Sequence, residues 1–319
     1  MHLLIVRHGQ SENNVIEAAI GAGAAFEERR SVDPPLSALG RRQAELLGRH
    51  LGAQLQGCRG RVQLICSSMT RAMQTLQPLA TCLQGTSVTV HPDVHEVCGF
   101  YSSGGAVSGP TQDDVSRFWG SRRADASLIP CSGQGAETCG EAAARAKRMA
   151  QLLRDWAAAD EKSETVVVLV SHNDFINLLA RELLVPSASC SVAANSAEGM
   201  FEDSYWAMNN TAVSHLMLGV RAPAGSYPVN AWLVYWNRSD HLLERERSGV
   251  QFKNVGLLQA GQWARVGEGG SGCKADFVEQ DVVRLIAAGG FRDWLVRHRV
   301  ALLGWSAATG LMLLRLMGR

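Results

Sequence analysis

The sequence predicts an α/β fold, a three-layer sandwich in which a mostly parallel central sheet is flanked by helices. The first observation is that short apolar runs, typical of buried strands, alternate along the chain with longer stretches of helical periodicity. The second is their order, because alternating strands and helices favour parallel strands covered by helices. A chain of 319 residues that is 46% hydrophobic can bury one large core, with an appendix rather than a second domain of equal size.

Each element follows from a local pattern. Strands are predicted at 3–7, 62–66, 88–90, 166–170, 215–218 and 231–236. Helices are predicted at 37–55, 70–82, 112–119, 137–158 and 174–184. In the first of these helices Ser37 is a good N-cap, and leucines recur at near-helical spacing on one face.

The segments between and after these elements divide the chain. Glycine and small polar residues predict loops at 102–110 and 131–140 and an insertion at 187–204. The run 267–272, which is mostly glycine, is typical of a flexible linker. We therefore expect a catalytic domain over 1–245, a linker over 246–275 and a separate C-terminal segment over 276–319.

Composition narrows the class of protein. A net charge of +1 argues against a general nucleic-acid-binding surface, which needs a strong basic excess. The eight cysteines are scattered without a Cys-x-x-Cys pair, so neither a zinc site nor a compact disulfide framework is predicted. We expect reduced, intracellular thiols, no metal and no cofactor. The apolar run at the N-terminus is too short for a signal peptide, which favours a cytoplasmic location.

Chemistry-bearing residues follow the predicted strands. Arg7-His8-Gly9 ends the first, the segment 67–75 with Arg71 follows the second, and His95-Glu96 follows the third. Ser171-His172 comes directly after the fourth. Ligands of such sheets bind beyond the carboxyl ends of the strands, so the two histidines are expected to meet there.

These motifs resemble those of the histidine phosphatase superfamily, in the branch that includes the cofactor-dependent phosphoglycerate mutases. The segment 7–14 resembles the family's opening motif, 35–40 its second landmark and 68–75 its Ser-x-x-x-Arg-Ala-x-Gln-Thr segment. The segments 171–175 and 237–242 resemble its later motifs, so the resemblance covers roughly the first three quarters of the chain. It implies the phosphoglycerate mutase-like fold.

The resemblance and the chemistry together assign roles. A neutral imidazole attacks phosphorus well if a fixed acceptor, such as a backbone carbonyl, holds its other proton, and His8 is the expected nucleophile. The transferring phosphoryl group needs a cationic pocket, for which the planar guanidiniums of Arg7 and Arg71 are suited. The resemblance implies that His172 donates to the same oxygens from the opposite side, and it carries Asn14 over as a further phosphate contact.

A carboxyl group is needed to protonate the leaving alkoxide and to deprotonate the later water. Glu96 matches the family's position, with Asp174 and Glu12 as the nearest alternatives in the sequence. The segment around Glu96 resembles neither the mutase nor the fructose-2,6-bisphosphatase pattern closely, which leaves the substrate open. His95 either lines the pocket or lies on a surface loop.

Three pairs of adjacent arginines are predicted to be solvated charges. They are Arg29-Arg30, Arg41-Arg42 and Arg122-Arg123. The last pair is also a minor candidate for contacting an anionic substrate.

Three functions are compatible with these residues. The favoured one is a phosphomonoester hydrolase working through a phosphohistidine on His8, with a phosphorylated small molecule or phosphoprotein as substrate. A phosphoglycerate mutase-like phosphotransferase is the alternative. A non-catalytic scaffold of the same fold is disfavoured because every expected catalytic residue type is present.

The C-terminus carries an uncharged, mostly apolar run over 300–314 with basic residues on both sides. At about 1.5 Å per residue it is slightly short for a hydrocarbon core of about 30 Å. A tail anchor in an intracellular membrane and a helix packed on protein or on a membrane surface are the alternatives, and we favour the anchor. The preceding 276–294 segment is amphipathic, which suits a membrane interface or a partner groove.

Overall fold

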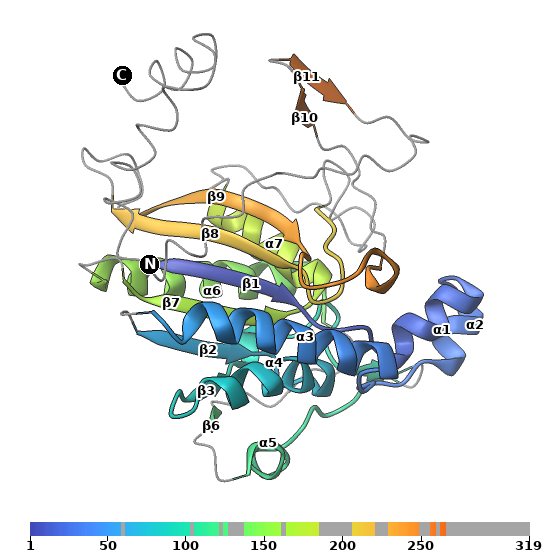
Figure 1. Ribbon diagram of the computed structural model, residues 1–319. Coiled ribbons are helices and arrows are strands. Elements are labelled where there is room, and N and C mark those ends of the chain that lie inside the picture. Colours follow the sequence, from blue (N-terminus) through green and yellow to red (C-terminus); the bar gives the residue numbers. More distant parts are fainter. Residues whose placement is uncertain are drawn as a thin grey trace.

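The computed structural model describes residues 1–58, 61–102, 105–120, 124–126, 137–160, 164–184, 206–220, 229–248, 256–259 and 262–265. Its centre is a seven-stranded sheet in the order β6-β3-β2-β7-β1-β8-β9 (Figure 1). These strands are β1 (His2–Arg7), β2 (Val62–Cys66), β3 (Val88–Val90), β6 (Ala124–Ala126), β7 (Val166–Ser171), β8 (Val213–Val220) and β9 (Val229–Arg238). Neighbours from β6 to β1 are parallel, whereas β8 and β9 are antiparallel additions, so the sheet is mostly parallel as predicted.

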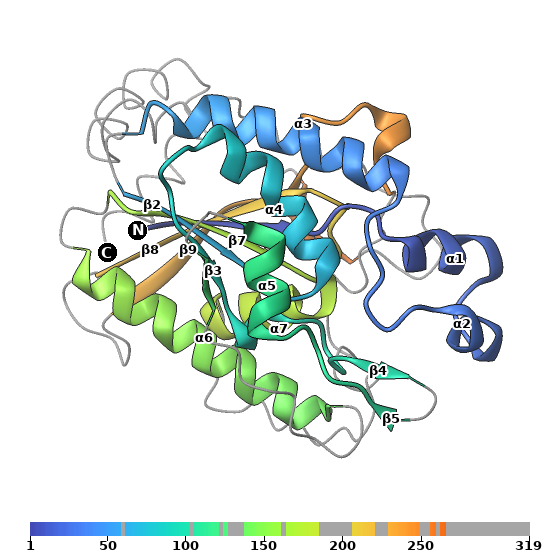
Figure 2. The ribbon, with the colours of Figure 1, turned by 90° about the horizontal axis from the view of Figure 1, so that it is seen from below.

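Helices cover both faces of the sheet and make the three predicted layers. Figure 2 shows α3 and α4 on one side of the strands and α6 and α7 on the other. The helices are α1 (Glu12–Ile20), α2 (Ala24–Arg29), α3 (Ala38–Leu55), α4 (Thr70–Cys82), α5 (Gln112–Trp119), α6 (Cys139–Ala159) and α7 (Asn173–Leu184).

Successive side chains of the central strands pack alternately against the two helical layers. In β1, Leu3 and Ile5 belong to the core cluster under α6 and α7, and Leu4 and Val6 belong to the cluster under α3, α4 and α5. Successive strand side chains point to opposite faces, so a strand buried on both faces is a continuous apolar run. That is why the central strands are recognisable in the sequence.

The predicted elements agree closely with the structure. The ranges 62–66, 88–90, 70–82 and 112–119 coincide with β2, β3, α4 and α5. Ser37 caps α3, because its side chain accepts a hydrogen bond from the N–H of Gly40. The helix predicted from 137 begins at Cys139, since Thr138 is its N-cap and bonds to Glu141.

The structure adds elements to segments for which none was predicted. Helices α1 and α2 follow the first motif, and β6 lies at the edge of the sheet. The range 102–110 was predicted as a loop, but a short hairpin begins there, formed by β4 (Tyr101–Ser102) and β5 (Gly105–Ala106). Two-residue strands are too short to give a periodic signal.

The structure describes three parts of the predicted linker at 246–275, which are 246–248, 256–259 and 262–265. The 3-10 turn η2 (Glu244–Glu246) ends in a buried Glu246 that pairs with Arg42, and the Ser248 hydroxyl accepts a hydrogen bond from the Asn210 N–H. Further along, β10 (Gly256–Gln259) and β11 (Gln262–Arg265) pair with each other in an antiparallel sheet.

Several predicted features lie outside the described residues. They are the insertion at 187–204, the glycine-rich run at 267–272 and the whole C-terminal segment at 276–319. Among the described helices, none combines the length and apolarity that crossing a membrane requires.

Candidate active site

The candidate catalytic residues follow the carboxyl ends of four neighbouring strands. Arg7 is the last residue of β1, and its register partner Ser171 is the last residue of β7. His8 and His172 therefore emerge side by side, with ring centroids 5.0 Å apart. Arg71 lies in the first turn of α4, after β2, and Glu96 lies after β3 and the 3-10 turn η1 (Pro92–Val94). The sequence predicted that the two histidines meet at this end of the sheet.

Close packing fixes the backbone around His8. Gly9 lies against the start of α3, where an added Cβ would come within 2.8 Å of the Gly40 carbonyl oxygen. Gly40 is tighter still, since its Cβ would lie 2.0 Å from the Gln10 oxygen. From α4, Thr75 accepts a hydrogen bond from the Gly9 N–H at 2.9 Å. The segments 7–14, 35–40 and 68–75 thus pack directly against one another. Gly9 and Gly40 are required because the backbones approach too closely for a side chain.

The hydrogen bonds of His8 determine which ring nitrogen is bare. Its Nδ1 lies 2.7 Å from the Gly9 carbonyl oxygen, which can only accept, so the ring proton is on Nδ1. The Nε–H of Arg71 donates to His8 Nε2 at 3.3 Å. Burial, followed by the charges of Arg71 and Arg7, holds the pKa of His8 well below its ordinary range. His8 is therefore a neutral imidazole with an unprotonated Nε2.

The two guanidiniums are held from different parts of the chain. Arg71 is buried and lies 3.9 Å from the Asp33 carboxylate, which also accepts hydrogen bonds from the N–H and hydroxyl of Thr70. Asp33 thus caps α4 in place of a local N-cap side chain. Arg7 donates to the Met208 carbonyl from the loop before β8. Asp33 has no local sequence signal, because its partner is 37 residues away.

His172 is fully buried beside His8. Neither of its ring nitrogens has a hydrogen-bond partner among the described residues. Burial, followed by the charges of Arg71 and His8, holds the pKa of His172 well below its ordinary range. An unpaired buried polar group costs about 1–3 kcal/mol, so a ligand that bonds to this ring would recover part of that cost.

Glu96 lies in the loop after η1, is partly buried, and contacts the first turn of α7 through its carboxylate. Its Oε1 accepts hydrogen bonds from the N–H groups of Val97, at 3.0 Å, and Phe175, at 3.1 Å. Burial and then the Asp174 charge raise the pKa of Glu96 to about 7, although Arg71 lowers it. A carboxyl group with this pKa can both donate and accept a proton near neutral pH. The alternative Glu12 is exposed on α1.

The described hydrogen bonds of Asn14 are made at the start of α1. It lies on α1, and its Oδ1 accepts hydrogen bonds from the N–H and the hydroxyl of Ser11, both at 3.1 Å. The side chain is thus one half of the capping box that begins α1. Among the described contacts, none links Asn14 to His8, Arg7 or Arg71.

Two other sequence assignments can be compared with the structure. Arg30 was predicted to be solvated, but it lies over the Tyr101 ring at 4.0 Å and donates to the Tyr101 carbonyl, so it links α2 to the β4–β5 hairpin. Arg29 is exposed, as predicted. His95 turns its Nδ1 to the Pro92 carbonyl at 2.6 Å, which is a structural role in the loop. Arg122 and Arg123 lie outside the described residues.

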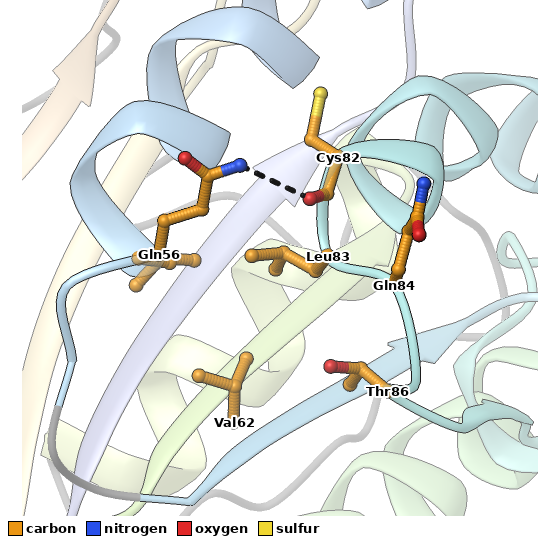
Figure 3. Close-up of a pocket in the computed structure, with 7 residues that line it drawn as sticks. Gln56, Val62, Cys82, Leu83, Gln84 and Thr86 are labelled. Carbon is orange, nitrogen blue, oxygen red and sulfur yellow. Dashed lines mark hydrogen bonds between the residues drawn. The ribbon is translucent and has the colours of Figure 1, made fainter.

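One hollow lies at the end of the sheet opposite to His8 and His172. It has a volume of about 530 Å³ and is lined by residues from the ends of α3 and α4 and the start of β2. Figure 3 shows Gln56 reaching across it, where its side-chain amide donates to the Cys82 carbonyl at 3.3 Å. Among the described residues, no three His, Cys, Asp or Glu side chains are grouped so as to hold a metal ion.

The family model of the histidine phosphatase superfamily (branch 1) matches residues 3–191, which is more than half of the chain. The protein therefore belongs to the histidine phosphatase superfamily. The matched range contains every residue of the cluster described above.

Solved structures with a similar chain path include three phosphatases. The mycobacterial glucosyl-3-phosphoglycerate phosphatase complexed with VO3 has 23% identity and a TM-score of 0.44, with 75% of this chain and 99% of that chain covered. The ecdysone phosphate phosphatase from Bombix mori, with tungstate, has 16% identity, a TM-score of 0.47 and 72% and 91% coverage. The protein histidine phosphatase SixA, also with tungstate, has 15% identity, a TM-score of 0.37 and 74% and 95% coverage. No curated protein matches the chain.

Proposed function

We propose that the protein is a phosphomonoester hydrolase that works through a phosphohistidine on His8. The observation that carries this proposal is the state of the His8 ring, whose proton is held by a backbone carbonyl while Nε2 faces a guanidinium. A nucleophile needs an available lone pair, and an attacking group near an anionic phosphate needs cations around it. His8 Nε2 meets both requirements.

The pocket supports binding of the phosphoryl group. Arg71 donates to His8 Nε2, and a phosphoryl group arriving at that nitrogen would take over the donor as a ligand of its oxygens. Arg7 contributes a second positive charge beside His8, and His172 has two ring nitrogens without partners among the described residues. These groups stabilise negative charge that spreads over the equatorial oxygens in the transition state.

The reaction balances with these residues alone. In the first half, the Nε2 lone pair forms a bond to phosphorus, the bond from phosphorus to the ester oxygen breaks, and protonated Glu96 gives its proton to the departing oxygen. In the second half, water attacks phosphorus, Glu96 takes a proton from that water, and the bond from phosphorus to Nε2 breaks. Inorganic phosphate leaves, and His8 and Glu96 regain their starting states.

Release of inorganic phosphate tests the proposal. The panel contains sugar phosphates, phosphoglycerates, phosphopeptides and p-nitrophenyl phosphate, each assayed with the wild-type protein and with His8→Ala. Release from at least one substrate that is lost in His8→Ala supports the hydrolase. Transfer of the phosphoryl group between phosphoglycerates that outpaces its release would assign the protein as a mutase instead.

A further inference from the structure

Arg145 is a buried guanidinium that the proposed mechanism does not use. It lies on the inward face of α6 and is only 3% exposed. Its charge is balanced by Glu137, with Nε to Oε1 and Nη2 to Oε2 both at 2.6 Å. A buried ion pair of this kind adds little net stability, because desolvation opposes the attraction. Its geometry is therefore more informative than its energy.

The guanidinium binds the backbone that carries Glu96. Its Nη1 donates to the carbonyl oxygens of Asp93, at 2.7 Å, and His95, at 2.9 Å, and its Nη2 donates to that of Glu96 at 3.4 Å. Three carbonyls in a four-residue stretch thus converge on one rigid, planar group. The position of the guanidinium therefore determines the path of the loop after β3.

Arg145 also contacts the residue that holds the Glu96 carboxylate. Its guanidinium lies over the ring of Phe175, 4.6 Å from the centroid, and the Phe175 N–H donates to Glu96 Oε1. On the other side of the loop, the Glu137 N–H donates to the Cys98 carbonyl at 3.3 Å. The pair therefore contacts the backbone on both sides of Glu96 and one donor of its carboxylate.

We infer that Arg145 and Glu137 form a positioning pair that sets where the Glu96 carboxyl group lies relative to the leaving-group oxygen. This inference rests on the proposed role of Glu96 as proton donor. Arg145 is a positioning residue, because its own contacts are with backbone carbonyls, Glu137 and Phe175. A general acid must lie within hydrogen-bond reach of the group that it protonates, and a misplacement of about 1 Å can cost about 100-fold in rate, so a shift of the loop slows the step that needs a proton.

Arg145→Lys tests the inference, because lysine keeps the charge but cannot reach three carbonyls and a carboxylate together. We expect kcat/KM for an alkyl phosphate to fall about tenfold more than kcat/KM for p-nitrophenyl phosphate, whose phenolate scarcely needs a proton. Competitive inhibition by inorganic phosphate should be unchanged, since the phosphate pocket is untouched. Arg154→Lys is the matched control: it lies on the same helix, is buried, and donates to the Glu182 carbonyl instead.

Equal losses on both substrates, or the same pattern in Arg154→Lys, would overturn the inference. If Arg145→Lys does not fold, Glu137→Gln is tested in its place. Glutamine still offers one side-chain oxygen to Arg145, and Arg145 keeps its hydrogen bonds to the three carbonyls. In a Glu96→Gln background, the leaving-group effect of either variant should disappear. Glu96→Gln alone separates the two hypotheses. If Glu96→Gln loses equal activity on both substrates, the proposed role of Glu96 fails. If Glu96→Gln loses activity selectively on the alkyl phosphate and Arg145→Lys does not, only the positioning pair is refuted.

Discussion

Replacing Glu96 with glutamine should make the folded protein more stable in alkali while it removes the proton donor. Burial and the neighbouring Asp174 raise the pKa of Glu96 to about 7 from an ordinary 4.5. The amide oxygen of glutamine can accept the same two hydrogen bonds from Val97 and Phe175. The substitution therefore removes a charge that the site disfavours and keeps the contacts that hold the side chain.

Proton linkage gives the sign and size of this effect on the free energy of unfolding. The folded-state pKa lies above the unfolded value, so the stability from this proton is present below pH 4.5 and is lost as pH rises through about 7. One pKa unit is worth about 1.4 kcal/mol, which gives a total of roughly 3.5 kcal/mol. Most of this loss, roughly 2.5 kcal/mol, falls between pH 5 and pH 8.

Urea unfolding of the wild-type protein and Glu96→Gln at pH 5 and pH 8 measures this effect. The difference in unfolding free energy should move in favour of Glu96→Gln by roughly 2.5 kcal/mol between the two pH values. Glu141→Gln is the control: Thr138 lowers the pKa of Glu141, so this group is ionised at both pH values and its difference should stay constant. A constant difference for Glu96→Gln as well would refute the electrostatic account of the site.

Three further outcomes are expected. First, kcat/KM for alkyl phosphates should fall above about pH 7 as Glu96 loses its proton, and a profile with no alkaline limb would remove Glu96 as the donor. Second, Arg71→Lys should recover little of the roughly 10²-fold or greater loss in kcat/KM of Arg71→Ala, because an ammonium cannot reproduce the guanidinium fork; full recovery would show that charge alone suffices. Third, a chain truncated before Gly272 should stay folded and active, whereas the full chain should fractionate with membranes and resist carbonate extraction through 300–314. A full-length protein found only in the soluble fraction would contradict that proposed anchor.

The central layers of the fold were predictable because burial imposes a pattern. Strands β1, β2 and β7 are apolar on both faces, and α3 and α4 show helical periodicity, so local sequence and tertiary environment agree. Helix α1 gave no such signal, since Val15 and Ile20 are exposed and only Asn13 is buried. A helix without an apolar face cannot be found by its periodicity.

The candidate site was predictable where a residue follows a strand and not where it acts across the fold. His8 and His172 meet because β1 and β7 are parallel neighbours, and the order of elements implies the parallel sheet whose carboxyl end carries both residues. Asp33 and Arg145 act on residues 37 to 52 positions away in sequence, and no local motif reports such contacts. One signal did exist for Arg145: it is a charge on the face of α6 that also carries buried Ala142, Ala146 and Met149.

Trapping the phosphorylated enzyme tests whether His8 carries the phosphoryl group. Substrate labelled in its phosphoryl group is mixed with enzyme, quenched in alkali within a turnover, and the labelled peptide is identified. A phosphohistidine mechanism predicts an adduct that is stable in alkali and labile in acid, located on His8 and absent from His8→Ala. A label on another residue, or a His8→Ala variant that turns over substrate at the wild-type rate, would contradict it.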